Sequence, residues 1–142
     1  MNLSPHFTLA ELTITGTGLR NVPTPAILAN LRRTAEGLER VRATLGGKPI
    51  AVSSGYRAPP VNAKVGGSKT SDHVKGLASD FTCRAFGTPL EVCGALVEAE
   101  LPFDQLIHEY GRWVHIGFGP RMRSQVMTID RLGKRVGLKA AR

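Results

Sequence analysis

Asp80 lies in the middle of an apolar, strand-like segment, LASDFTC, at residues 77–83. Side chains alternate along a strand, so Asp80 should share one face with Ala78 and Thr82. An ionised carboxylate inside an apolar strand costs free energy unless it is paired or bound to a cation. The chain must therefore fold so that a cationic or metal-binding partner reaches this face of the strand.

Two histidines can supply that partner. His73 lies where a Gly- and Ser-rich segment meets the strand, and Gly76 allows the chain to turn so that His73 and Asp80 converge. His115 lies in a second strand-like segment, WVHIGF, on the same face as Trp113. A lone histidine is more often a surface or core residue than a ligand. Two histidines and one carboxylate, with a fourth position open to water, are the pattern of a catalytic zinc site.

A zinc hydrolase also needs a general base and a cation near the developing oxyanion. Glu109, six residues before His115, is the candidate base. A two-residue turn at 111–112 would turn Glu109 away from His115, whereas a three-residue turn over 110–112 would place both on one face. Arg57 is the candidate cation, because its planar fork suits a carboxylate or a polarised carbonyl. Taken singly, Glu109 can equally pair with a neighbouring arginine, and Arg57 can be solvated.

The rest of the chain alternates between helical and strand patterns. Residues 8–12 and 88–101 begin with capping boxes, and the long apolar stripe between Thr24 and Gly46 has helical spacing. Strands are expected at 48–54, 77–83 and on both sides of the 110–112 turn, with a further hairpin around 132–134. Residues 55–76 look like a long irregular loop, a feature that is usually functional in a compact domain.

These patterns predict one α+β domain over residues 1–142, since no repeat, linker or low-complexity block divides it. We expect a small antiparallel sheet with helices packed on one side and the long loop across one sheet face. The apolar runs are too short to span a membrane, and the N-terminus shows no signal peptide pattern.

The charge is concentrated near the C-terminus. The formal net charge is +8, and residues 121–142 contain seven basic residues and one acid, Asp130. Such a segment suggests a polyanionic partner such as an anionic cell wall, but it can equally be a solvated, solubilising terminus. No aromatic and basic interleaving supports specific nucleic-acid binding.

The two cysteines, Cys83 and Cys93, have no zinc-ribbon or CxxC spacing. They are expected to be two buried free thiols, with a disulfide as the alternative.

Three stretches together resemble one known family. They are SGYR at 54–57, VNAKVGGSKTSDHVKGLASDF at 61–81 and FDQLIHEYGRWVHIGF at 103–118. They are similar to the zinc D-Ala-D-Ala carboxypeptidase and phage endolysin family, which shares its Hedgehog/DD-peptidase scaffold with the lysostaphin-type endopeptidases. The resemblance covers roughly residues 3–120, and 121–142 form a basic extension beyond it.

The resemblance implies one Zn²⁺ per chain, bound by His73, Asp80 and His115. It also implies that Glu109 acts as the base and that Arg57 holds a substrate carboxylate or carbonyl. We expect the remaining substrate contacts from three further side chains: Ser71, Tyr56 and Trp113.

Two positions depart from the family pattern. In many relatives the catalytic glutamate lies three residues before the last histidine, where this chain has Arg112. The six-residue spacing of Glu109 resembles the Hedgehog arrangement instead. Some relatives carry a histidine two residues before the last ligand, where this chain has Trp113.

The function expected from these features is zinc-dependent cleavage of a peptidoglycan stem-peptide amide next to a D-amino acid. A phage or prophage endolysin is the first hypothesis: a monomer made in the bacterial cytoplasm without a signal peptide, which acts at the wall after release. The alternatives are a D-Ala-D-Ala carboxypeptidase of cell-wall metabolism and a catalytically inactive, zinc-containing wall-binding module.

Overall fold

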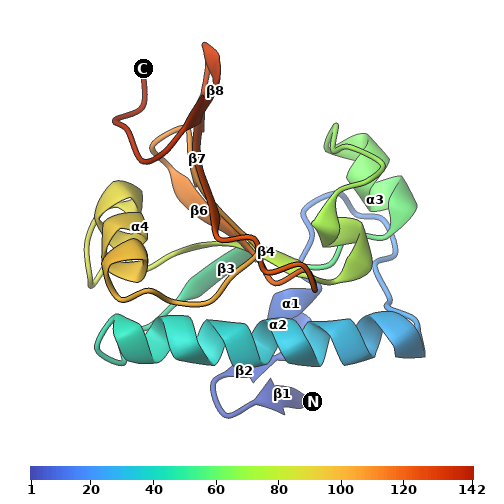
Figure 1. Ribbon diagram of the computed structural model, residues 1–142. Coiled ribbons are helices and arrows are strands. Elements are labelled where there is room, and N and C mark those ends of the chain that lie inside the picture. Colours follow the sequence, from blue (N-terminus) through green and yellow to red (C-terminus); the bar gives the residue numbers. More distant parts are fainter.

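A computed structural model describes all residues, 1–142, as a six-stranded sheet with helices and a small N-terminal hairpin (Figure 1). The hairpin pairs β1 (Asn2–Ser4) with β2 (Phe7–Thr8). The large sheet has the strand order β3-β4-β6-β5-β7-β8. Its strands are β3 (Ala51–Ser54), β4 (Ala78–Thr82), β5 (Gln105–Glu109), β6 (Trp113–Gly117), β7 (Gln125–Asp130) and β8 (Gly133–Val136).

The helices begin where the caps predict them. Thr8 caps α1 (Leu9–Leu12) and Thr88 caps α4 (Pro89–Glu98), each in a complete capping box. Thr24 caps α2 (Pro25–Thr44), with Pro25 at the first helical position. None of the helices combines the length and the apolar character that a membrane crossing requires.

Two expectations were wrong. The sheet is neither small nor purely antiparallel, because β5 and β7 pair in parallel. β6 has β4 on one side and β5 on the other, so the next strand must join an outer edge of the sheet, and β7 joins the edge at β5. The segment 55–76 is not wholly irregular: it contains α3 (Pro59–Lys64), begun by two prolines, and the 3-10 turn η1 (Asp72–Lys75).

The two faces of the sheet differ in chemistry. A single hydrophobic core contains residues of α2 and α4, and β4, β5 and β6 contribute Phe81, Leu106, Val114 and Ile116 to it from one face of the sheet. The residues between them, including Asp80 and His115, point to the opposite face. Both cysteines are buried and free, as expected, and burial raises the pKa of the Cys93 thiol to about 12.

The basic segment 121–142 supplies two strands of the sheet. The expected hairpin is present, with its turn at 131–132. Asp130, whose side chain is 1% exposed, accepts hydrogen bonds from Leu132 N (2.9 Å), Arg135 Nη2 (2.6 Å) and Arg142 N (3.0 Å). These bonds hold the last residues of the chain against β7.

Gly37 of α2 lies against the ring of Phe118, which leaves no room for a Cβ atom. Gly37→Ala should lower the free energy of unfolding by up to about 2 kcal/mol, because an overpacking cost of about 1–3 kcal/mol exceeds the gain in helix propensity of about 1 kcal/mol. Gly94→Ala in α4 is the matched control, since nothing lies within 4 Å of its new Cβ. Urea denaturation should show Gly94→Ala unchanged or more stable; equal stability of both variants would contradict this packing.

Candidate metal centre

Asp80 and His115 face each other across the β4–β6 ladder. The antiparallel register pairs Asp80 with His115 directly, so both side chains lie on the face opposite the core. His115 Nδ1 lies 3.0 Å from Asp80 Oδ1. The strand register alone thus places one histidine beside the buried carboxylate.

His73 reaches the same carboxylate from the turn η1. Ser71 Oγ accepts a hydrogen bond from His73 N (3.2 Å) at the start of η1, and Gly76 ends it with φ at 72°. His73 Nε2 lies 3.3 Å from Asp80 Oδ1, and His73 Nδ1 lies 2.7 Å from the carbonyl oxygen of Gly55. When Nδ1 donates its proton to that carbonyl, Nε2 remains free as a ligand atom.

The donor set of His73, Asp80 and His115 suits zinc. One ligand atom from each residue lies within 4.8 Å of the other two, and all three residues are buried. Two imidazole nitrogens and a carboxylate oxygen are donors that Zn²⁺ accepts, and they leave one position of a tetrahedron open. A structural zinc site would close that position with a fourth protein ligand.

Burial and neighbouring groups shift the pKa values of all three residues. Burial alone would raise the pKa of Asp80, but hydrogen bonds from His115 and His73 lower it below its usual range. Burial lowers the pKa of His73, which favours the neutral imidazole that a metal needs. For His115 the hydrogen bond to Asp80 and the negative charges of Asp80 and Glu109 outweigh burial, so its pKa is raised.

Zinc affinity should fall as the pH is lowered, because zinc and a proton compete for His115. A raised pKa keeps this imidazole protonated below that pKa, and each pH unit there should weaken zinc binding by up to about tenfold. Calorimetric titrations in buffers of different ionisation enthalpy should show proton release on binding. His6→Ala, which removes an exposed histidine, should leave the pH dependence unchanged; zinc affinity that is equal at pH 6 and pH 8 would refute the competition.

Glu109 shares the face of the metal ligands. Tyr110, Gly111 and Arg112 form a three-residue turn, and Glu109 pairs with Trp113 as the functional interpretation requires. The turn needs positive φ at Tyr110 (57°) and Gly111 (68°). Glu109 Oε1 lies 4.0 Å from His115 Nδ1. Burial raises the pKa of Glu109, which makes its carboxylate a stronger base.

Arg57 is held beside Asp80 by three contacts. Its Nε lies 3.1 Å from Ser54 Oγ, Nη1 lies 3.3 Å from Asn62 Oδ1, and Nη2 lies 3.4 Å from Asp80 Oδ2. A guanidinium has five N–H donors, so these contacts leave two for another acceptor. Gly67 packs so closely against Asn62 that a larger residue there would displace this support.

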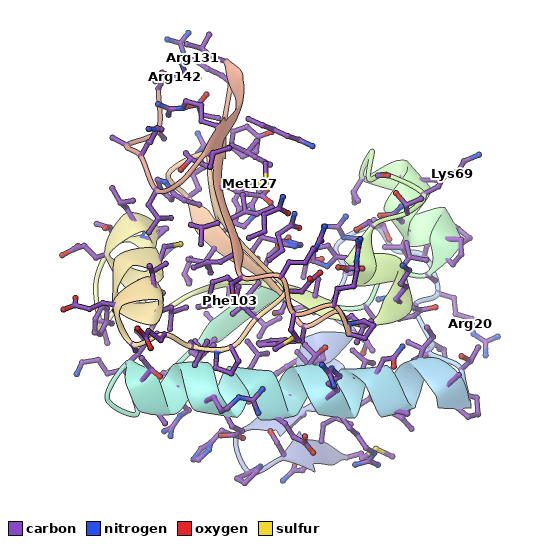
Figure 2. All side chains as sticks on the ribbon, in the orientation of Figure 1. Arg20, Lys69, Phe103, Met127, Arg131 and Arg142 are labelled. Atoms are coloured by element: carbon purple, nitrogen blue, oxygen red, sulfur yellow. The ribbon has the colours of Figure 1, made fainter.

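A cleft of about 1030 Å³ opens over the centre. In Figure 1 the strands β7 and β8 stand on one side of the molecule and α3 stands on the other. Figure 2 labels Arg131 near the outer end of β8 and Lys69 beside α3. Besides the ligands, the lining includes Arg57, Glu109, Ser71 and Trp113. Tyr56 is not among the lining residues: its side chain is buried in the hydrophobic core, so the structure does not bring this expected contact to the cleft.

Several residues that line the cleft were not expected from the sequence. Lys134 and Arg121, from the basic segment, line the cleft together with Asp72 and Asp104. The two carboxylate oxygens of Asp104 accept hydrogen bonds from Nε (2.9 Å) and Nη2 (3.0 Å) of Arg123. This bidentate pair fixes the loop between β6 and β7. The clustering of basic residues was visible in the sequence, but their place in the cleft follows from the pairing of β7 with β5.

Comparison with known proteins agrees with this geometry. The family model described as Peptidase M15 matches residues 5–117. The zinc D-Ala-D-Ala carboxypeptidase of Streptomyces albus G is 35% identical over 77 residues, which are 53% of this chain and 30% of that protein. The match therefore covers less than two thirds of the length of that relative. Both findings confirm the family resemblance of the sequence motifs.

Proposed function

This chain belongs to the peptidase M15 family, and we propose that it is a zinc peptidase that hydrolyses an amide bond of peptidoglycan stem peptides next to a D-amino acid. The observation that carries the proposal is the position of Glu109 on the sheet face that holds the His73, Asp80 and His115 cluster. A metal-binding cluster alone is compatible with a binding module, whereas a half-buried carboxylate beside it supplies a base for hydrolysis.

His73, Asp80 and His115 would hold the zinc. When bound, zinc polarises the scissile carbonyl and lowers the pKa of water. Gly55 orients His73 through its carbonyl oxygen, and Arg57 orients Asp80 through its Oδ2. Each contact restricts the orientation of a ligand side chain in the metal-free protein.

Glu109 would move the proton. Its carboxylate takes a proton from the attacking water and then gives it to the nitrogen of the leaving amine. Partial burial suits both steps, because it raises the pKa of Glu109 towards the working pH.

Arg57 would orient the substrate. Two of its donors are free of the protein contacts described above, and the residue lines the cleft. A substrate carboxylate or carbonyl oxygen that accepts these donors would be held in a fixed direction relative to Asp80. Ser71 and Trp113 line the same cleft and complete the proposed substrate contacts.

We place the site of action at the bacterial cell wall, in the manner of a phage or prophage endolysin. Exposed basic residues of the C-terminal segment that form no ion pair, such as Arg131, supply positive charge towards an anionic wall. Arg123, Arg135 and Arg142 are partly neutralised by Asp104 and Asp130, so they contribute less.

A D-Ala-D-Ala carboxypeptidase is the second candidate, favoured by the activity named for the Streptomyces albus G relative. The two activities differ in their products. Mass spectrometry of purified, cross-linked peptidoglycan treated with zinc-loaded protein should show stem-peptide fragments from internal cleavage. Release of free D-alanine alone would favour the carboxypeptidase, and no product from either bond would contradict the proposed function.

A further inference from the structure

Lys134 lies in one row with the proposed catalytic base. The register pairs Glu109 on β5 with Ile129 on β7, and Ile129 with Lys134 on β8. Residues paired across a sheet point to the same face, so Lys134 extends the face of the metal centre towards the sheet edge. The cleft lining includes both Glu109 and Lys134, which agrees with this direction.

Lys134 has no acidic partner. Its side chain is exposed and forms no ion pair, unlike Arg123, Arg135 and Arg142 of the same segment. Arg121 also lines the cleft, but it lies close enough to the carboxylate of Asp104 to affect its pKa. Lys134 is therefore the cation of the β7–β8 side whose charge is available to a ligand in the cleft.

The spacing matches a short peptide. Lys134 is two strands from Glu109, or about 10 Å at the usual separation of neighbouring strands. An extended peptide advances about 3.3–3.6 Å per residue, so this distance corresponds to roughly three residues. A peptide cut beside Glu109 would thus bring a group two or three residues away to Lys134.

We propose that Lys134 is a specificity-determining residue that binds a substrate carboxylate two or three residues from the scissile bond. The proposal rests on the proposed peptidase function and deepens it: the preferred substrate is an anionic peptide, and the basic C-terminal segment forms part of the substrate site. Residues 133–136 then serve substrate selection in addition to any attraction to the wall.

The test compares two synthetic stem peptides that are identical except for a carboxylate or a carboxamide at that position. The wild-type protein should cleave the carboxylate peptide with a KM about three- to fivefold lower, as expected for one partly exposed ion pair, and with the same kcat. Lys134→Gln should abolish this preference. Lys139→Gln, the same charge change at an exposed residue outside the cleft, should retain it.

The dissociation constants of both peptides for zinc-loaded Glu109→Gln protein, with and without Lys134→Gln, provide a second measurement that needs no turnover. Equal binding of the two peptides, or a preference that survives Lys134→Gln, would overturn the role of Lys134. A preference lost equally in Lys139→Gln would also overturn it, because net charge would then be the cause. If the wild-type protein cleaves neither peptide, the proposed function fails, while the binding measurement still decides on Lys134.

Discussion

Replacing Glu109 with glutamine should lower kcat for peptide hydrolysis by about 10³-fold while leaving one zinc per chain. General acid–base groups typically contribute 10²–10⁴-fold to the rate of a reaction. Glu109 lies beside the metal cluster but is not one of its proposed ligands. Glutamine keeps the size of the side chain but cannot accept a proton at neutral pH. The measurements are steady-state kinetics and the zinc content of the purified variant.

Glu98→Gln is the matched control, because Glu98 is exposed at the end of α4 and forms no ion pair. It should have wild-type kcat and wild-type zinc content. A Glu109→Gln protein that keeps its zinc and at least a tenth of the wild-type kcat would show that another group takes the proton. Loss of zinc in this variant would instead make Glu109 a ligand.

Replacing His73 with alanine should weaken zinc binding by about 100-fold or more. Changes to groups that only orient a ligand already cost 10–100-fold in metal affinity, and here a ligand itself is removed. The change also leaves the Gly55 carbonyl without its donor. Zinc content after dialysis should fall far below one per chain, and the rise in Tm that zinc gives the wild-type protein should disappear.

His6→Ala controls for the loss of a histidine as such. His6 is half-exposed and contacts Glu39, far along the chain from the cluster. This variant should keep one zinc per chain and the full zinc-dependent rise in Tm. One tightly bound zinc in His73→Ala would show that His73 is not a ligand.

Much of the candidate site could be predicted because strand parity is a local property. Alternation places Asp80 and His115 on faces that can be read from the sequence, and the antiparallel register joins them. The orientation of Glu109 depended on the length of one turn, and the glycine within 110–112 is compatible with the three-residue form found in the structure. Helix starts followed from Thr–Glu capping pairs, which act within a single turn.

The features that were missed depend on contacts between distant segments. The parallel pairing of β5 with β7 follows from which sheet edge is free after β6 has two neighbours, and no local pattern specifies that edge. Lys134 reaches the cleft only through this pairing. Tyr56 follows a strand end, where alternation no longer decides direction, and its apolar ring is buried in the core.

Hydrolysis should depend on the zinc that His73, Asp80 and His115 are proposed to hold. The direct test treats purified peptidoglycan with the protein before chelation, after zinc removal, and after one equivalent of zinc is restored, with fragments quantified by mass spectrometry. Fragments should disappear with the zinc and return at one zinc per chain. Fragment release that survives complete removal of zinc, or none when one zinc is bound, would contradict this dependence on zinc.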